Sequence, residues 1–334
     1  MSVTLSNSDG QVSINELADG RKHIFAKPND PALFVPVAEC TTAYPSDLIE
    51  HIFNVKGLAW LCDEIGRDED ANYVQRLLLN DLYAYFLPGD FSGKRILDFG
   101  CGSGASTAIL ARTFPDADIV GVELVDDLLS IAKKRVEFYG LSNVTLLRSP
   151  SGSELPPNLG EFEVVIMSAV VEHLLPSERG VILPMLWSSV KPGGFLFLDQ
   201  TPNRAFPFEL HTTMLPFINY LPDKIAHQYA RTFSKRIDKS DSWESLLRQG
   251  IRGATVSEIT RQLSIQTSKP LLIEPDKNGI KDRVDLWYQN TNPQNMAVLK
   301  SVAKILLKAV RSTTGISFVS DLSLLFQKPK GLSD

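Results

Sequence analysis

Three glycines at alternate positions are the feature of this 334-residue sequence whose types and spacing most clearly predict chemistry. Gly100, Gly102 and Gly104 follow a short apolar run, Lys94–Phe99, and precede a helical pattern over Ala105–Phe114. A strand that ends in a glycine turn and opens a helix directs backbone N–H groups and the positive helix end at a ligand. Glycine also lets that ligand approach where a Cβ would collide. The spacing therefore predicts a nucleotide- or nucleoside-binding turn.

Two acids near this turn bear on which ligand it takes. The glycines also fit the dinucleotide pattern G-x-G-x-x-A, which would end at Ala105. Glu123 ends the next predicted strand, where an acid binds ribose hydroxyls in either case. Asp98, two residues before Gly100, would repel a pyrophosphate but attract the ammonium of a methionyl group. The acids favour S-adenosylmethionine, and an NAD(P)-dependent oxidoreductase is the alternative.

Histidines after two later strands are the candidate bases. His173 follows a predicted strand over 162–168, and His211 follows one over 195–200. Ligands of open α/β sheets bind at the carboxyl ends of the strands, and histidine titrates near neutral pH. Glu209 would share a side with His211 in an extended segment and orient it. We predict that His211, with His173 as second candidate, accepts a proton from a hydroxyl nucleophile. A helix cap at 173 and a lid surface residue at 211 are the structural alternatives.

The elements that must position these residues alternate between strands and helices. Short apolar runs separated by helical patterns predict a parallel, doubly wound α/β sheet of the Rossmann-like kind. The predicted strands are 94–99, 117–123, 144–148, 162–168, 195–200, 271–274 and 318–326, and the helices include 105–114, 126–139, 178–190 and 295–309.

Changes in apolar spacing and in residue composition divide the chain into four parts. Helical spacing of apolar residues between 48 and 86 predicts an N-terminal helical cap region over 1–90, with short alternations at 11–14 and 23–25 as weaker strand signals. The alternating core occupies 91–203. Aromatic and proline residues then predict a lid insertion over 204–268, and 269–334 completes the core sheet.

Four segments resemble the class I S-adenosylmethionine-dependent methyltransferases in order and spacing. They are ILDFGCGSGASTAILA (96–111), VGVELVDDLLSIAKKRV (120–136), FEVVIMSAVVEHLL (162–175) and LWSSVKPGGFLFLDQTPN (186–203). The resemblance implies a seven-stranded sheet whose last strand is antiparallel, methyl transfer (EC 2.1.1), and S-adenosyl-L-methionine as cofactor. It implies cofactor contacts at Asp98, Gly100, Cys101, Gly102, Gly104, Glu123, Leu124, Ser151, Ser168 and Ala169.

One departure concerns the adenine. The family commonly has an acid after the third strand facing the adenine amino group, but residues 148–154 read RSPSGSE. Ser151, a backbone carbonyl or Glu154 would accept that hydrogen bond instead.

An enclosing aromatic lid suits a small-molecule or glycan acceptor, with oxygen as the nucleophile, better than a flat macromolecular surface. A non-catalytic S-adenosylmethionine-binding regulatory protein and a protein or RNA methyltransferase are further alternatives.

The composition of the chain limits the classes of binding partner that we expect. A net charge of −5 argues against nucleic acid, because binding phosphates requires a basic surface. Three unpaired cysteine positions and the absence of an apolar leader or membrane-length apolar run predict a cytoplasmic protein without an integral membrane segment. No His, Cys or carboxylate spacing typical of a metal site is present, so we expect none.

Overall fold

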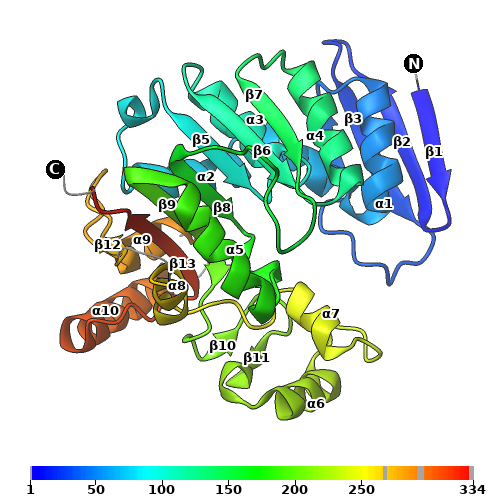
Figure 1. Ribbon diagram of the computed structural model, residues 1–334. Coiled ribbons are helices and arrows are strands. Elements are labelled where there is room, and N and C mark those ends of the chain that lie inside the picture. The colour runs from blue at the N-terminus through cyan, green and yellow to red at the C-terminus, as the bar shows by residue number, and fades with distance from the viewer. Residues whose placement is uncertain (1, 266–268, 292–296, 331–334) are drawn as a thin grey trace. The chain divides into compact units, whose positions relative to one another are not determined.

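The computed structural model describes residues 2–265, 269–291 and 297–330. The chain divides into two compact units (Figure 1). Unit 1 comprises residues 1–77 and 101–148, and unit 2 comprises residues 78–100 and 149–334.

A seven-stranded sheet is the core of the fold, and it confirms the predicted Rossmann-like class. Its hydrogen-bonded order is β12-β13-β9-β8-β5-β6-β7. β8 is parallel to β5 and β9, β6 is parallel to β7, and β13 is antiparallel to both β9 and β12. The strands are β5 (Arg95–Phe99), β6 (Asp118–Glu123), β7 (Val144–Arg148), β8 (Phe162–Ser168), β9 (Val190–Pro202), β12 (Leu271–Ile273) and β13 (Asp321–Gln327).

Residues 96–99 and 164–167 are all buried, and all of them except Asp98 are apolar. Strands buried on both faces read as continuous apolar runs, which explains why these two were predicted from sequence.

Unit 1 contains two helices next to β6 in the sequence and a small sheet at the N-terminus. α3 (Ala105–Thr113) follows the glycine turn, and α4 (Asp126–Phe138) follows β6. An antiparallel sheet of β1 (Ser2–Asn7), β2 (Gly10–Glu16), β3 (Lys22–Pro28) and β4 (Glu39–Thr42) packs beside α1 (Ser46–Glu69), as the blue end of Figure 1 shows.

The N-terminal sheet differs from the helical cap region predicted over 1–90. Val12, Ile14, Ile24 and Ala26 are buried at period two and share a hydrophobic cluster with α1 residues such as Ile52. Helices begin only at Ser46 and continue in α2 (Val74–Tyr83). α1 is itself two helices joined at Gly57, whose φ of 75° breaks the helical run.

Unit 2 carries the insertion and the C-terminal helices. α5 (Pro176–Ser189) joins β8 to β9 through the 3-10 helix η2 (Val171–His173). The insertion has its own small apolar core, formed by residues such as Leu215, Ala230 and Leu246. Its elements are β10 (Phe208–Glu209), β11 (Leu215–Pro216), η3 (Ile218–Tyr220), α6 (Asp223–Phe233), α7 (Trp243–Arg248) and α8 (Val256–Leu263), and the 3-10 helix η1 (Pro88–Phe91) precedes β5.

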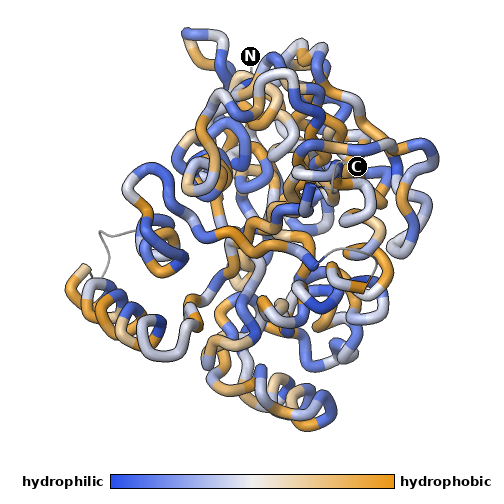
Figure 2. Tube along the Cα trace, turned by 60° about the vertical axis from the view of Figure 1, so that its left-hand side comes forward, coloured by the Kyte–Doolittle hydropathy of each residue, from blue (hydrophilic) through white to orange (hydrophobic). Residues whose placement is uncertain are grey.

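The helix predicted over 295–309 is observed as α10 (Ala297–Thr314), which packs on α9 (Arg283–Asn290). Residues 295 and 296 lie outside the described residues. α10 carries strongly apolar and strongly polar residues (Figure 2), and its polar side faces the protein. Lys304 and Lys308 pair with Asp285 at 2.9 and 2.7 Å, whereas Ile305 is 68% exposed.

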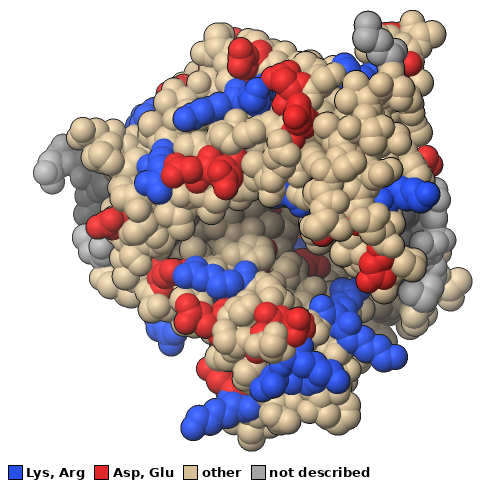
Figure 3. Space-filling view, turned by 90° about the vertical axis from the view of Figure 1, so that its right-hand side faces the viewer, with Lys and Arg blue, Asp and Glu red and all other residues tan. Residues whose placement is uncertain are grey.

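Helix hydropathy and surface charge are the last two features of the fold. Within the described ranges, none of the helices combines the length and apolar character needed to span a bilayer. On the face that Figure 3 shows, basic and acidic side chains are interspersed rather than separated by sign.

Candidate functional site

The glycine turn begins at the end of β5, and its three glycines differ in what surrounds them. A Cβ on Gly100 would lie 2.7 Å from the Val170 side chain. A Cβ on Gly104, the N-cap of α3, would lie 2.9 Å from the Ala132 backbone. At Gly102, where φ is 56°, a Cβ would meet nothing within 4 Å. Gly100 and Gly104 therefore allow close packing, whereas Gly102 borders open space that a ligand can enter.

Glu123 at the end of β6 holds the turn in place. Its carboxylate accepts hydrogen bonds from the backbone N–H of Gly102 at 2.8 Å, Leu124 at 2.8 Å and Val125 at 2.9 Å. Cys101 donates its N–H to the Val122 carbonyl at 3.0 Å. A carboxylate has about four lone-pair sites and three are used, so Glu123 keeps capacity to accept about one further hydrogen bond, as from a ribose hydroxyl. The structure thus brings together the predicted residues Cys101, Gly102, Glu123 and Leu124.

A buried ion-pair network lies behind the turn, and sequence reasoning missed it. Arg135 of α4 is fully buried and donates to the Ser103 carbonyl at 2.7 Å and to Glu64 Oε1 at 2.8 Å. The Ser103 hydroxyl also donates to Glu64. Burial opposes ionisation of Glu64, but the charges of Arg135 and Lys56 outweigh it and lower the pKa of Glu64 to about 2. The available signal was Glu64 and Asp68, two acids inside the apolar stripe of α1.

In unit 2, strands β5, β8 and β9 bring further predicted residues to their carboxyl ends. Asp98 is 1% exposed and lies in β5 opposite Ile166 of β8. Ala169 has a φ of 53°, which is uncommon for a residue with a side chain, and donates its N–H to the Asp199 carbonyl at 3.0 Å. Gln200 donates to the Ser168 hydroxyl at 3.3 Å. Burial, with the nearby Glu172 and Asp98, raises the pKa of Asp199.

The two side chains predicted near the adenine contact each other. The Ser151 hydroxyl donates to the Glu154 carboxylate at 3.1 Å, and Ser149 donates to the Glu154 carbonyl at 2.6 Å. They form a tight turn directly after β7.

The two candidate histidines meet at the carboxyl ends of β8 and β9. The His173 and His211 rings pack edge to face with centroids 5.8 Å apart. His173 Nδ1 lies 2.7 Å from the Arg248 carbonyl, and His211 Nδ1 lies 3.3 Å from the Thr212 hydroxyl. Desolvation lowers the pKa of His173, although 45% of its side chain is exposed.

Glu209 organises the loop that carries His211. Its carboxylate accepts hydrogen bonds from the backbone N–H of His211 at 2.7 Å, from the N–H of Thr212 at 2.8 Å and from the Thr213 hydroxyl at 2.6 Å. The contact is therefore with the His211 backbone and not with its ring, so Glu209 fixes the path of the chain.

Glu172 is a site residue that sequence reasoning did not single out. It is fully buried beside the histidines, and its Oε2 accepts a 3.3 Å hydrogen bond from Thr201. Its Oε1 has no hydrogen-bond partner among the described residues. Burial raises its pKa to about 8. The available signal was an acid within the apolar segment 169–175.

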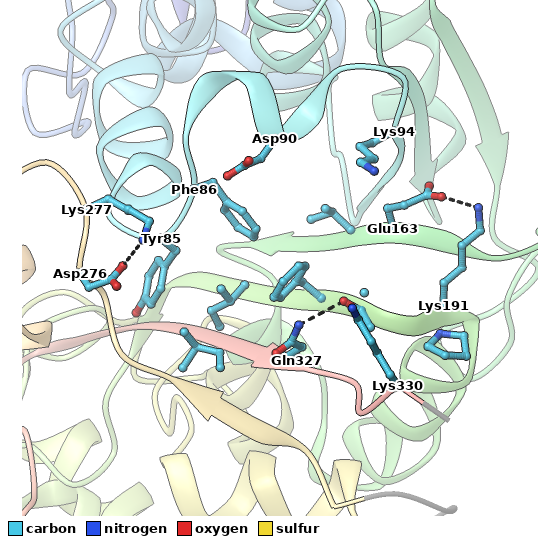
Figure 4. Close-up of a pocket in the computed structure, with 17 residues that line it drawn as sticks. Tyr85, Phe86, Asp90, Lys94, Glu163, Lys191, Asp276, Lys277, Gln327 and Lys330 are labelled. Carbon is cyan, nitrogen blue, oxygen red and sulfur yellow. Dashed lines mark hydrogen bonds and ion pairs between the residues drawn. The ribbon is translucent and has the colours of Figure 1, made fainter. Parts of the chain in front are cut away.

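Two cavities in unit 2 lie at opposite ends of the strands. One of about 200 Å³ adjoins the end of β9 and is lined by Glu209, His211, Arg252 and Asp321 among others. The other, of about 640 Å³, is lined by Lys94, Glu163 and Lys191 near the amino ends of β5, β8 and β9 (Figure 4). Ligands of open α/β sheets bind at the carboxyl ends, so the smaller cavity is the candidate ligand site.

Comparison with known proteins relates the core of the chain to methyltransferases. Residues 96–194 match the family model of a methyltransferase domain. The chain is 30% identical to a fatty-acid O-methyltransferase of Mycolicibacterium smegmatis over 52% of this chain and 62% of that one. It is 28% identical to a ubiquinone biosynthesis O-methyltransferase of Acinetobacter baylyi over 35% of this chain and 47% of that one.

The matches thus span about half to three fifths of these relatives' own lengths. Among solved structures, the YcgJ protein of Bacillus subtilis is 15% identical with a TM-score of 0.42, covering 78% of this chain and all of that one.

The sheet order, the glycine turn with its acids, and the matched methyltransferase domain agree with one another. Residues 96–194 match a methyltransferase domain, and this match together with the similar methyltransferases supports a class I S-adenosylmethionine-dependent methyltransferase with S-adenosylmethionine as cofactor.

Proposed function

We propose that this protein transfers the methyl group of S-adenosylmethionine to a hydroxyl oxygen of a small-molecule or glycan acceptor. The observation that carries the proposal is the pair His173 and His211 beside a cavity at the carboxyl end of β9. The similar fatty-acid and ubiquinone biosynthesis enzymes are both named as O-methyltransferases, which supports oxygen as the acceptor atom.

In this proposal the cofactor is held by the predicted residues. Asp98 pairs with the ammonium of the methionyl group, and Glu123 accepts the ribose hydroxyls. The N–H groups of the glycine turn approach the cofactor at Gly102, where open space adjoins the backbone. The remaining proposed contacts are Gly100, Cys101, Gly104, Leu124, Ser151, Ser168 and Ala169.

The chain's main contributions to the reaction are alignment and proton removal. The acceptor oxygen forms a bond to the methyl carbon while the carbon–sulfur bond breaks, and S-adenosylhomocysteine leaves. Alignment of the two reactants supplies much of the rate enhancement. A neutral hydroxyl must also lose its proton, and we assign its activation to His211 and His173. Glu209 acts as a positioning residue because it holds the backbone of the His211 loop.

The test begins with binding. Titration calorimetry with S-adenosylhomocysteine and, separately, with NAD distinguishes a methyltransferase from an oxidoreductase. Tight binding of NAD alone would reject the proposal. A regulatory protein would bind S-adenosylhomocysteine but would transfer no label.

Methyl-labelled cofactor incubated with a bacterial extract then identifies the acceptor class. We expect label in the small-molecule or glycan fraction, and label confined to protein or RNA would contradict the proposed acceptor. His211→Ala should lower turnover by about 100-fold while S-adenosylhomocysteine affinity stays near normal. His227→Ala is the matched control, because His227 of α6 bonds to the Asp241 carbonyl and does not line the proposed cavity.

A further inference from the structure

Glu172, which the proposed function does not use, forms one group with the two proposed activating residues, His173 and His211. One oxygen or nitrogen from each lies within 4.8 Å of those of the other two. They come from η2 and from the loop after β10, so the fold brings them together rather than local sequence spacing. We propose that these three side chains bind one divalent transition-metal ion with open coordination positions.

The hydrogen bonds of the two histidines leave the nitrogens that a metal needs. His173 Nδ1 lies 2.7 Å from the Arg248 carbonyl, so Nδ1 carries the proton and Nε2 keeps its lone pair. The Thr212 hydroxyl donates to the Gln249 carbonyl at 2.9 Å, so its oxygen is left to accept from His211 Nδ1. Metal-binding histidines commonly donate their other ring N–H to an oxygen in this way. Both rings are therefore fixed with Nε2 available.

The carboxylate between the histidines lacks a partner that a cation would supply. Glu172 is fully buried, and its Oε1 lies 3.8 Å from His173 Nε2 without a hydrogen bond from any described residue. A buried polar atom without a partner is costly, so native structures seldom keep one. Asp199 adds a nearby buried carboxyl group, and Asp321 adds a nearby exposed one. Arg179 lies nearby but makes no hydrogen bond to Oε1, because it donates to the Glu172 carbonyl and pairs with Glu258.

The spacing and accessibility of the group fit an open site. Two ligands about 2.1 Å from an ion at a tetrahedral angle are about 3.4 Å apart, close to the 3.8 Å between Glu172 and His173. Gly250 makes room, because a Cβ there would lie 2.8 Å from His211 Nδ1 and 3.3 Å from Glu172 Cγ. The His173 side chain is 45% exposed, so solvent or an acceptor can reach the ion.

Ligand chemistry selects the class of metal. Two imidazoles and one carboxylate suit zinc, iron, cobalt or manganese, whereas calcium and magnesium prefer oxygen ligands alone. Three protein ligands with an open position are typical of catalytic sites. The site is thus of the transition-metal type and departs from our expectation that the chain holds no metal.

The role of the ion rests on the proposed function. An acceptor hydroxyl bound at the open position would lose its proton to water more readily, because a divalent ion lowers the pKa of a bound oxygen. The oxygen then takes the methyl group from sulfur, and the electron pair of the carbon–sulfur bond stays on sulfur. His173 and His211 activate the acceptor through the ion in this scheme.

Cobalt is the probe for the test, because its d–d absorption reports ligand geometry without turnover. Chelator-treated full-length protein should bind one equivalent of Co²⁺, with visible absorption that Zn²⁺ abolishes by competition. His211→Ala and Glu172→Gln should weaken Co²⁺ binding at least about 100-fold, whereas His227→Ala should bind as the unaltered protein does. Absence of absorption, or equal binding by all four proteins, would overturn the site.

Thr212→Val provides a variant that keeps all three ligands and nearly the same shape. It removes the acceptor of the His211 N–H bond together with the hydroxyl that donates to the Gln249 carbonyl, so Co²⁺ affinity should fall about tenfold. Unchanged affinity would contradict the assigned tautomer and with it the site.

Measuring labelled methyl transfer alongside Co²⁺ binding separates the two proposals. Labelled transfer without Co²⁺ binding would remove the metal site and leave the proposed function intact. Co²⁺ binding without labelled transfer to any small acceptor would do the reverse.

Discussion

Glu64→Gln is the perturbation that best tests how the cofactor turn is supported. The substitution keeps the shape of the side chain but removes the charge that faces Arg135 at 2.8 Å and Lys56 at 3.1 Å. Arg135 would keep Asp68 at 3.2 Å and the Ser103 carbonyl at 2.7 Å, and would lose only the charge of Glu64. The variant therefore isolates one ionised carboxylate in a site that is almost fully buried.

The magnitude follows from the pKa of Glu64. It falls from an ordinary value of 4.5 to about 2, a difference worth about 3 kcal/mol in the free energy of unfolding at neutral pH. Removal of one member of a buried ion pair costs a similar amount, about 3–5 kcal/mol. For a chain of this size we expect the melting temperature to fall by several degrees.

The sign of the pH dependence is fixed by the direction of the shift. The unfolded chain holds the proton of Glu64 more tightly, so folding stability rises with pH. The stabilisation from Glu64 is nearly complete above pH 4.5 and is lost as pH falls towards 2.

Urea unfolding at a series of pH values measures the difference between the two proteins. The difference in free energy of unfolding should be constant from pH 7 to about pH 5 and should shrink below pH 4.5. Glu50→Gln is the control, because Glu50 lies exposed on the same helix. A difference below about 1 kcal/mol at pH 7, or one that is independent of pH, would refute this account of the network.

Two further predictions concern the turn and the C-terminal helix. Gly102→Ala should weaken S-adenosylhomocysteine binding at least about tenfold by calorimetry, because its methyl group enters open space beside the turn. Gly104→Ala should instead lower stability more in urea unfolding, because its methyl group meets the Ala132 backbone; the reverse ranking would contradict our assignment. In thermal unfolding, Ile305→Asp should change stability by less than about 0.5 kcal/mol, whereas Lys308→Met should cost about 1 kcal/mol. Equal losses would show that the apolar side of α10 is covered.

Sequence reasoning succeeded where the signal lies within one segment. The strand at 162–168 is a continuous apolar run, and the turn at 100–104 shows its glycines directly. The N-terminal sheet gave a weaker signal, because β1 is exposed along most of its length and so has little alternation to detect. The antiparallel end strand is implied by family resemblance, because local periodicity carries no strand direction.

The residues that were missed depend on partners far along the chain. Arg135 and Glu64 are 71 positions apart, and each looks like a surface charge on a helix until the two helices meet. His173 and the carbonyl of Arg248 are 75 positions apart, and their bond sets the protonated nitrogen of the ring. Glu209 was placed beside His211 correctly in sequence, but only the fold shows that it bonds to backbone N–H groups.

The histidine end of unit 2 is built mainly by polar contacts to backbone carbonyls. Arg179 donates to the carbonyls of Leu174 and Gly253, and Thr212 donates to that of Gln249. These contacts join η2 to the loops at 209–213 and 248–253, and the exposed cavity-lining side chain of Phe208 takes no part in them. Such an arrangement lets cavity-lining residues such as Phe208 change while the histidines stay in place. Under the proposed function, acceptor choice should therefore follow the insertion, whereas the glycine turn binds only the methyl donor.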